Sequence, residues 1–338
     1  MSALARRALA RNRPVTAVTR LLPWTSIGVG AAILYHRIDD PPGNPELEIS
    51  PSLGLSSFQA QLDELGRRYE LVYASELLDA IKRRRRGQRL PIAITFDDDL
   101  ESHRKHAVPL VSALGAPATF FVAGMSPGAG HSYWWERLER IVAAGTPPAD
   151  AVPHGVSEPL SGGADDPAAT IHQAARAISQ LEANERSVVE ARLAELDPGD
   201  GSAGLDQTDL SDIASAGFEI GFHTKGHHIL PQLDEADLER ALVDGKGELE
   251  EVIERPVTLI AYPHGKADGR VASAARAAGY RVGFRASNRA IAADADPLLL
   301  DRIVPARWSK EELRASLARA LVDAHLPPHT DTSSRRLR

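Results

Sequence analysis

Two segments of the sequence combine carboxylates and imidazoles in a spacing that suits a metal centre. ITFDDD places Asp97 beside Asp98, and HTKGHH places His223 four residues before His227. That spacing puts two imidazoles on one side of a helical turn, and one carboxylate with two imidazoles binds a divalent metal with positions left open for water. Alone, the Asp pair could cap a helix and the His residues could lie on the surface. Together they favour a metal ion held by one Asp and both His, with the other Asp taking protons.

Each of these chemistry-bearing residues follows a short apolar stretch that is typical of a buried strand. The stretches are ILY, IAITF, FEIGF and VTLIA, and they are followed by His36, by Asp97 and Asp98, by His223 and His227, and by Tyr262, Pro263 and His264. Parallel strands carry their chemistry at their C-terminal ends in α/β barrels and in doubly wound sheets. The sequence therefore predicts one functional face at that end of a parallel sheet.

Helical and strand-like patterns alternate along most of the chain, which predicts an α/β fold with a mainly parallel sheet. Further strands are expected at PATFFVAG, YRVGF and LLLDRIV, and helices at about 56–69, 208–216 and 234–254. Ser caps are expected for the first of these helices, at Ser75 and at Ser309. Residues of about 126–206 hold Gly- and Pro-rich loops and an Ala- and Glu-rich helical piece, so we interpret them as an insertion rather than a second domain.

Composition narrows the classes of protein that fit. The chain has 338 residues, a net charge of −7 and no Cys. The charge gives no reason to expect binding to nucleic acid. The lack of Cys excludes disulfides, thiolate metal sites and a Cys nucleophile.

The ends of the chain differ from its middle. Residues 1–20 form a basic lead-in, in which Arg residues interrupt the apolar run that a secretory signal needs. SIGVGAAILY is apolar but too short to span a membrane, so we interpret it as the first strand. These features favour a cytoplasmic protein, and they leave open a peripheral contact between the basic N-terminus and a membrane or another anionic surface. Residues 326–338 are expected to be a disordered tail.

The motifs together make the chain similar to the polysaccharide deacetylase family, carbohydrate esterases that remove N- or O-acetyl groups from glycans. ITFDDD matches the first motif of that family, HTKGH matches the second, and YPHG resembles the third. The segment from ELEISPSLGL to ELLDAI resembles the region before the first motif. The resemblance extends over about residues 31–318. It implies a deformed (β/α)7 barrel, which we place at residues 21–325, and an acetylated glycan as substrate.

The resemblance also implies a role for each motif residue. One divalent metal, usually zinc in this family, would be held by Asp98, His223 and His227. Asp97 would be the catalytic base that deprotonates a water. Substrate and oxyanion contacts would come from the third motif, which here is Tyr262, Pro263 and His264. The Thr224 hydroxyl would orient the loop that carries the ligands.

Two positions around the base depart from the family pattern. Asp99 stands where Gly is usual, and we expect its side chain to face solvent. Ala261 stands where many members have an Arg that pairs with the base. Arg302 is the natural substitute for that Arg, because a buried Asp that must stay ionised needs a positive partner.

The general acid that protonates the leaving amine has no motif position in this chain. Family members usually carry a His after the last strand, but LLLDRIV has none. His36, at the end of the first strand, is the preferred candidate, and His264 and His325 are alternatives. Each of the three could instead be a loop His bonded to the backbone.

The leading prediction is metal-dependent hydrolysis of acetyl groups, with N-acetyl favoured, from amino sugars of a polysaccharide or its precursor. Two alternatives stay open: a C–N hydrolase of a small amide or cyclic imide, and a catalytically inactive glycan-binding homologue. Tyr133, Trp134 and Trp135 could stack on sugar rings or anchor a helix to the core. The run KRRRRGQR at 82–89 is most simply a solvated helix end.

Overall fold

The structure, a computed structural model, describes residues 24–25, 28–123, 132–152, 167–181, 183–199 and 204–324. The expected basic lead-in, the expected tail and His325 lie outside these residues. No helix within them is long and apolar enough to cross a membrane.

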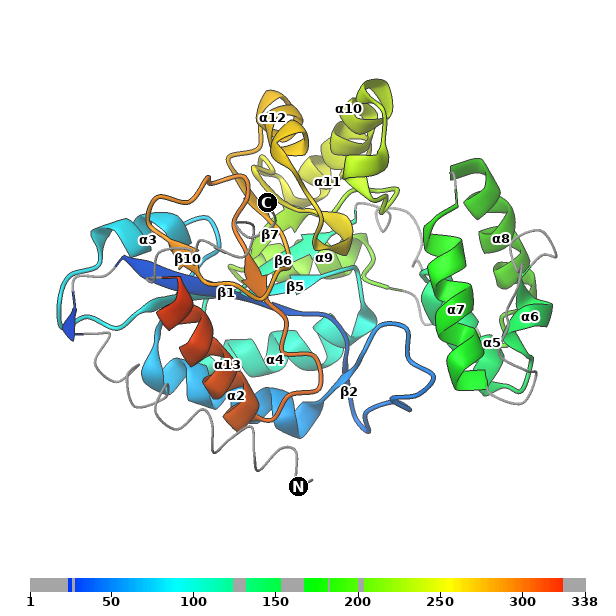
Figure 1. Ribbon diagram of the computed structural model, residues 1–338, viewed down its shortest axis with the longest axis horizontal. Coiled ribbons are helices and arrows are strands. Elements are labelled where there is room, and N and C mark those ends of the chain that lie inside the picture. Colours follow the sequence, from blue (N-terminus) through cyan, green and yellow to red (C-terminus); the bar gives the residue numbers. More distant parts are fainter. Residues whose placement is uncertain are drawn as a thin grey trace, which may run out of the picture.

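A mostly parallel sheet, nearly closed into a barrel, forms the centre of the molecule (Figure 1). Neighbouring strands follow the order β1 (Val29–Tyr35), β5 (Pro91–Asp97), β6 (Thr119–Val122), β7 (Glu219–Phe222), β8 (Leu259–Ala261) and β9 (Val282–Phe284). The circuit closes through β11 (Arg302–Ile303), which pairs with β1, and through a bridge between Phe284 and Leu300. Seven strands therefore complete the circuit, which confirms the predicted deformed (β/α)7 barrel.

Short additional strands distort this barrel. β4 (Glu70–Val72) pairs with the beginning of β5, whereas β6 pairs with its end. β10 (Ile291–Ala292) pairs antiparallel with the beginning of β1. β2 (Ile38–Asp39) and β3 (Leu53–Gly54) form a separate two-stranded sheet just beyond the end of β1.

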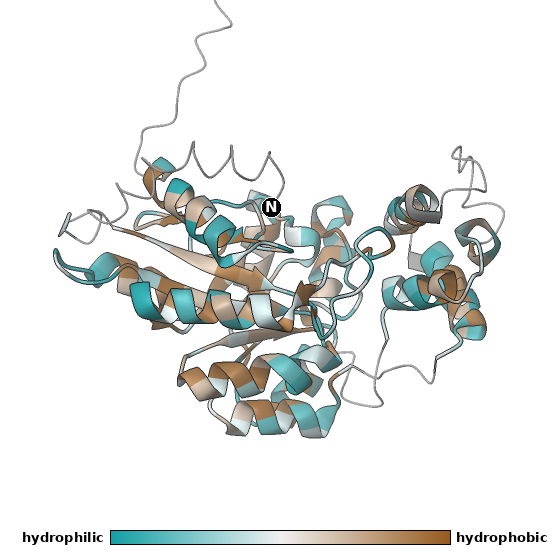
Figure 2. Ribbon diagram, turned by 90° about the horizontal axis from the view of Figure 1, so that it is seen from below, coloured by the Kyte–Doolittle hydropathy of each residue, from teal (hydrophilic) through white to brown (hydrophobic). Residues whose placement is uncertain are grey.

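The two central strands are apolar on both faces because side chains fill the barrel and helices cover it. All seven residues of β1 and all seven of β5 are buried. Parallel strands in such positions are continuous apolar runs rather than alternating ones. Figure 2 shows the hydrophobic strands in the interior and many hydrophilic residues on the surrounding helices.

Helices pack around the barrel with their apolar faces inward. They are α2 (Leu55–Arg68), α3 (Leu77–Arg83), α4 (Val108–Leu114), α9 (Gln207–Ser215), α10 (Glu235–Val243), α11 (Lys246–Ile253), α12 (Gly269–Ala277) and α13 (Lys310–Asp323). The single helix expected at 234–254 is wrong, because Gly245 between α10 and α11 is left-handed, with φ of 83°. Ser309 caps α13 as predicted. The Ser caps predicted for the first two helices are wrong, since the N-cap residues of α2 and α3 are Gly54 and Glu76, and neither makes a side-chain cap bond.

Four of the five described helices between β6 and β7 form a cluster beside the barrel (Figure 1). They are α5 (Trp134–Ala143), α6 (Pro148–Ala151), α7 (Pro167–Ser179) and α8 (Ala183–Leu196). Buried side chains such as Leu138, Ile171 and Leu193 give the cluster a core of its own. It occupies the segment that we interpret as an insertion.

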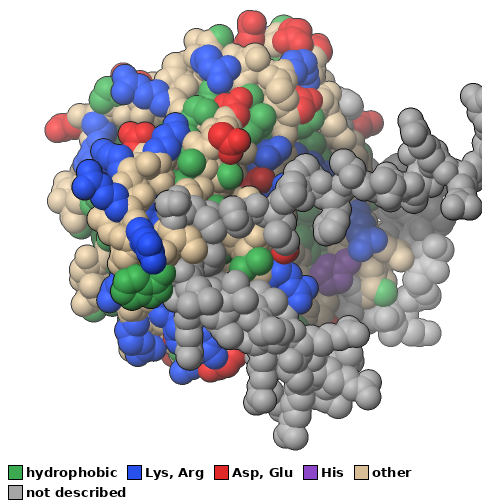
Figure 3. Space-filling model, turned by 60° about the vertical axis from the view of Figure 1, so that its left-hand side comes forward, with side chains coloured by type: hydrophobic (Ala, Val, Ile, Leu, Met, Phe, Trp, Pro, Cys, Tyr) green, Lys and Arg blue, Asp and Glu red, His purple; other side chains and the backbone are tan. Residues whose placement is uncertain are grey.

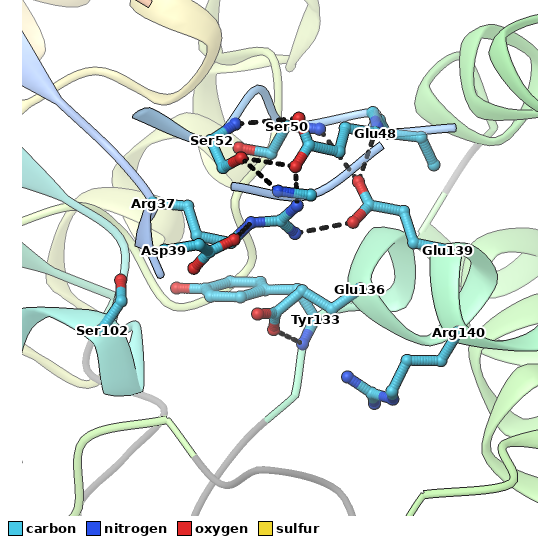
Figure 4. A network of polar contacts seen from close by, with 12 residues as sticks. Arg37, Asp39, Glu48, Ser50, Ser52, Ser102, Tyr133, Glu136, Glu139 and Arg140 are labelled. Atoms are coloured by element: carbon cyan, nitrogen blue, oxygen red, sulfur yellow. Dashed lines mark hydrogen bonds and ion pairs between the residues drawn. The ribbon is translucent and has the colours of Figure 1, made fainter. Parts of the chain in front are cut away.

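A polar network joins this helical cluster to the barrel (Figure 4). Arg37, which follows β1, donates to Glu139 of α5 at 2.6 Å and to Glu48 at 2.7 Å. Glu139 also accepts the backbone N–H groups of Ile49 at 2.5 Å and Ser50 at 3.1 Å. The loop between β2 and β3 is thereby held between the barrel and α5.

Candidate active site

Asp98, His223 and His227 lie together at the C-terminal ends of β5 and β7, with their potential ligand atoms within 4.8 Å of one another. Asp98 Oδ1 is 3.5 Å from His223 Nε2 and 3.6 Å from His227 Nε2. Ligand atoms at the usual distance from a tetrahedral zinc lie roughly 3.4 Å apart. The carboxylate oxygen is therefore spaced from both imidazole nitrogens as a single small cation requires.

The two imidazoles of this triad are also in a state that suits a cation, whereas burial and the neighbouring charge of Asp97 raise the pKa of Asp98 as long as no positive partner is bound. His223 Nδ1 lies 2.8 Å from the Ala261 carbonyl oxygen, to which it can only donate, so the lone pair is on Nε2, which faces Asp98. Burial lowers the pKa of both His223 and His227, so both are neutral, as metal ligands must be. Asp98 Oδ1 is buried and accepts no hydrogen bond from the described residues. A buried carboxylate oxygen of this kind calls for a positive partner.

Backbone strain is concentrated around the same residues. Seven described non-Gly residues have positive φ, and four belong to this region: Asp98 (73°), Thr224 (60°), His227 (45°) and His264 (57°). Each such conformation costs on the order of 1–3 kcal/mol and persists only where the surroundings enforce it. The turn at Asp98 explains how two consecutive carboxylates reach one cavity, although successive side chains of a strand point to opposite faces.

Thr224 shapes the ligand loop through its backbone. Its carbonyl accepts the N–H of His227 at 3.3 Å, which closes the turn between His223 and His227. Its hydroxyl oxygen is buried and makes no hydrogen bond with any part of the chain that the structure describes. The hydroxyl therefore does not orient the loop through a hydrogen bond, contrary to expectation.

Asp97 is held by Arg302, as the missing third-motif Arg led us to expect. Two guanidinium nitrogens of Arg302 donate to the two carboxylate oxygens of Asp97, each at 2.6 Å. Arg302 is fully buried, and Thr95 and the carbonyl of Arg285 accept its remaining hydrogen bonds. Burial alone would raise the pKa of Asp97, but Arg302, with a smaller contribution from His223, brings the pKa below its usual value. Asp97 is therefore an ionised carboxylate inside the protein.

These groups open into one cavity of about 340 Å³. Its polar lining includes His36, Asp97, Asp98, His223, His227 and His264. Trp134 and Trp135 of α5 form part of the apolar wall, with the Trp135 ring centroid 5.0 Å from that of His227. The barrel thus supplies the titratable groups, while the helical cluster supplies aromatic surface beside them.

Both described candidates for the general acid reach this cavity. Burial lowers the pKa of His36 to about 4 and that of His264 to about 4. The two differ in their surroundings: the Asp97 charge acts on His36 and raises its pKa, whereas the His264 ring packs 4.8 Å from the ring of His227. Of these two candidates, His36 is the one on which the Asp97 charge acts.

The expectation that Asp99 faces solvent is wrong. Asp99 is fully buried, and its carboxylate accepts the backbone N–H of Ala123 at 2.6 Å. Its own N–H donates to the Tyr133 hydroxyl at 3.3 Å, and its carbonyl accepts from Leu205 at 2.8 Å. Asp99 therefore joins the end of β5 to the end of β6 and to α5, because its turn directs the carboxylate inward.

Two of the three third-motif residues do not present their side chains to the cavity. Tyr262 is buried in the barrel core, where its hydroxyl donates to the Leu298 carbonyl at 2.8 Å. The Tyr262 N–H donates to Phe284 at 2.9 Å, and Pro263 has no N–H. Tyr262 is thus a structural residue, and His264 is the member of this motif that lines the cavity.

His103 is a neighbour of the site that sequence reasoning missed. It begins a π-helical turn, His103–Ala107, and its Nε2 lies 3.0 Å from the His36 carbonyl oxygen. Its ring is buried against Phe96 and Phe120. π-helical turns are rare and occur often at functional sites. No motif in the sequence marks this residue, because its place beside the site depends on a contact with His36, which lies 67 residues earlier, directly after β1.

Solved structures with a similar fold include a deacetylase of Streptococcus pyogenes, PplD, in complex with acetate. It is 16% identical, with a TM-score of 0.56 over 87% of this chain and 98% of that chain. BC0361, a polysaccharide deacetylase from Bacillus cereus, is 17% identical, with a TM-score of 0.54 over 86% of this chain and 69% of its own. IcaB from Ammonifex degensii is 16% identical, with a TM-score of 0.53 over 86% and 97% of the two chains. At these identities the likeness shows the fold alone.

The sequence gives the more specific relationship. No curated protein matches the chain. A family model described as polysaccharide deacetylase matches residues 84–184 and 200–283, which together make up more than half of the chain. The matched residues include both the ITFDDD and the HTKGH motifs. The chain belongs to the polysaccharide deacetylase family.

Proposed function

We propose that this protein uses one divalent metal ion to hydrolyse acetyl groups, N-acetyl groups in particular, on amino sugars of a polysaccharide or its precursor. One observation carries the proposal: a triad spaced for a cation and an ionised Asp97, paired with Arg302, line the same cavity. A metal centre beside a carboxylate base is what hydrolysis of an amide requires.

Asp98, His223 and His227 would hold the metal, and zinc suits a set of one carboxylate and two imidazoles. A divalent cation in this position would act as a Lewis acid that polarises the acetyl carbonyl and lowers the pKa of water. His223 is already fixed in the required tautomer by the Ala261 carbonyl. The site residues therefore need little rearrangement to accept the ion.

Asp97 is the proposed base. Its carboxylate lines the cavity, and Arg302 fixes its orientation and keeps it ionised. It can then take a proton from the water that attacks the acetyl carbonyl, a contribution of roughly 10²–10⁴-fold. Arg302 acts through Asp97, because the guanidinium is fully buried behind that carboxylate.

His36 is the proposed general acid. It lines the same cavity, where burial lowers its pKa to about 4 although the charge of Asp97 acts in the opposite direction. The resting imidazole is therefore neutral, and His36 would have to gain a proton during the reaction before it donates one to the leaving amine. We assign substrate contact to His264 and propose that Trp134 and Trp135 pack against a sugar face.

Two alternatives predict different outcomes. A C–N hydrolase of a small amide or cyclic imide would release ammonia or open a ring, and an inactive homologue would release nothing. The triad and the Asp97–Arg302 pair argue against inactivity, since a binding protein has no need of a buried charged base. Acetate release should be measured over a panel of N- and O-acetylated oligosaccharides, with cyclic imides alongside. Turnover of imides without acetate release from any glycan would overturn the proposal.

We also propose a contact between the molecule and an anionic surface. The basic lead-in lies outside the described residues, but the adjoining described surface has the same character. Trp24 is 64% exposed, and Arg84 donates to the Thr25 carbonyl at 2.8 Å, which places Trp24 beside the end of α3. Exposed Lys and Arg side chains follow there, at Lys82, Arg83, Arg85, Arg86 and Arg89. Figure 3, which brings this side forward, shows Lys and Arg gathered on one face.

A further inference from the structure

A belt of cavities runs along the seam between the barrel and the helical cluster. A cavity of about 240 Å³ shares Trp134, Trp135 and His227 with the catalytic cavity. It adjoins a cavity of about 420 Å³, with which it shares Arg186 and Lys225. The belt therefore offers space beyond the catalytic cavity, and His227 lines both the catalytic cavity and the first additional cavity.

Arg186 of α8 is the central charged group of this belt. It is only 7% exposed, and it lines both additional cavities. A guanidinium has five N–H donors. Within the described chain, the Arg186 guanidinium donates one hydrogen bond, a long one of 3.3 Å to the Gly226 carbonyl. The nearest carboxylate oxygen among the described residues belongs to Glu190 and is 3.9 Å away. A buried cation so weakly compensated is costly unless an anion completes the site.

The other charged groups around the 240 Å³ cavity leave it positive. Arg137 of α5 is half-buried and makes no ion pair within the described chain. Lys225 forms an ion pair with Glu248 at 3.3 Å, and both side chains of that pair are exposed. Glu190 is the one acidic side chain among the described residues of this lining. This local excess of positive charge stands out in a chain whose net charge is −7.

We propose that Arg137, Arg186 and Lys225 form a subsite for an anionic substituent, a carboxylate or a phosphate, on a sugar close to the one that is deacetylated. The inference rests on the proposed function and narrows its substrate to an anionic glycan. A planar guanidinium binds carboxylate or phosphate oxygens in pairs, so Arg186 gives both charge and orientation. Because Gly226 accepts from Arg186 and directly precedes His227, an anion bound here also sits against the loop that carries the metal ligand.

The test compares three matched N-acetylated oligosaccharides on the metal-loaded enzyme: one neutral, one with a carboxylate and one with a phosphate on the neighbouring sugar. Charged hydrogen bonds of this kind are worth about 1.5–3 kcal/mol, which corresponds to roughly a 10–100-fold higher kcat/KM for one of the anionic substrates. Arg186→Gln should bring the ratio of anionic to neutral kcat/KM close to one. Arg192→Gln is the control, since Arg192 lies on the same helix but is exposed and pairs with Glu195.

A binding measurement gives a second readout that needs no turnover. Calorimetry with the de-N-acetylated anionic oligosaccharides should show binding to the wild type that Arg186→Gln weakens about tenfold or more and that high salt weakens too. The oligosaccharide with the higher kcat/KM and the tighter binding shows whether the subsite takes a carboxylate or a phosphate.

Equal kcat/KM for neutral and anionic substrates in the wild type would overturn the subsite, and so would an equal loss on all three in Arg186→Gln. If no acetate is released from any substrate, the proposed function fails, while calorimetry still decides the subsite.

Discussion

Asp97 and Arg302 are separated by 205 positions in the sequence, yet they share two hydrogen bonds of 2.6 Å. Both are shielded from water, so each charge depends on the other. Removing one partner of such a buried pair typically costs about 3–5 kcal/mol, because the remaining charge is left uncompensated. Single substitutions at either position therefore affect folding as well as the proposed catalysis, and they must be judged by more than one measurement.

Asp97→Asn should keep the metal and lose most turnover. The amide cannot accept a proton from water, and the loss of the base corresponds to about 10²–10⁴-fold in kcat. Asp98, His223 and His227 are unchanged in this variant, so the metal content of the purified protein should equal that of the wild type. Activity within a few-fold of wild type would show that Asp97 is not the base.

Arg302→Gln should shift the pH dependence of the reaction. Arg302 lowers the pKa of Asp97, so its removal raises that pKa, and a higher pH is then needed to ionise the base. The acidic limb of the kcat/KM profile should move to higher pH with metal content unchanged. Arg285→Gln is a suitable control, since Arg285 pairs with Asp301 at 2.9 Å rather than with Asp97. An unmoved acidic limb in the Arg302 variant would contradict the assigned pairing.

The residue-level differences between prediction and structure have physical causes. Arg302 could be predicted, because a buried ionised base needs a cation and the last strand carries an Arg at its end. The inward turn of Asp99 could not, since it depends on the positive φ of the preceding Asp98. Tyr262 follows a strand like the site residues, but its side chain continues the strand's inward face and enters the core.

At the scale of the elements, apolar runs located the strands, because a strand buried on both faces must be apolar throughout. β1 and β5 were found in this way, and their C-terminal ends do carry the site. Contacts between distant segments were not predictable. The π-helical turn at His103–Ala107 and the network of Arg37 with Glu139 depend on where the barrel and the helical cluster meet.

Glu139→Ala tests how far the helical cluster supports the site. Removal of Glu139 leaves the Ile49 and Ser50 N–H groups without their acceptor and weakens the hold on Arg37 (Figure 4). We expect the free energy of unfolding to fall by about 3 kcal/mol. KM should rise as well, because Ile49 and Ser50 line the catalytic cavity.

Glu195→Ala provides the comparison for that experiment. Glu195 belongs to the same helical cluster, but its side chain is largely exposed, and within the described residues its ion pair is with Arg192, three positions earlier on the same helix. Surface pairs of this kind contribute about 0–1 kcal/mol. Denaturant unfolding should therefore show a large loss of unfolding free energy in Glu139→Ala and a small one in Glu195→Ala, and substrate titration should show a raised KM only in Glu139→Ala. Equal behaviour of the two would mean that the network does not brace the cavity.

At the scale of the whole molecule, charge is distributed unevenly. The net charge is −7, yet exposed Lys82, Arg83, Arg85 and Arg86 make no ion pair within the described residues and lie near exposed Trp24. This surface is near the start of β5, whereas the catalytic groups lie at its end. A molecule docked through the basic face would keep its active site away from the docking surface.

The full chain should bind vesicles that contain anionic lipid and should not bind purely zwitterionic ones. Each Lys or Arg near such a surface contributes about 1 kcal/mol, so neutralising Arg83, Arg85 and Arg86 with Gln should weaken binding on the order of a hundredfold. Cosedimentation at two salt concentrations measures this. Arg276→Gln, at an exposed residue paired with Asp296, is the control. Unchanged binding of the triple variant would rule out this face as the docking surface.

The central claim is that Asp98, His223 and His227 hold a metal on which deacetylation depends. The most direct measurement is metal content, determined together with acetate release from N-acetylated oligosaccharides, in the wild type, in His223→Ala and in His172→Ala, whose His172 lies in α7 outside the site. We predict one equivalent of divalent metal, most of it zinc, and activity in the wild type and in His172→Ala. His223→Ala should lose both together. Full metal content and full activity in His223→Ala would contradict the account.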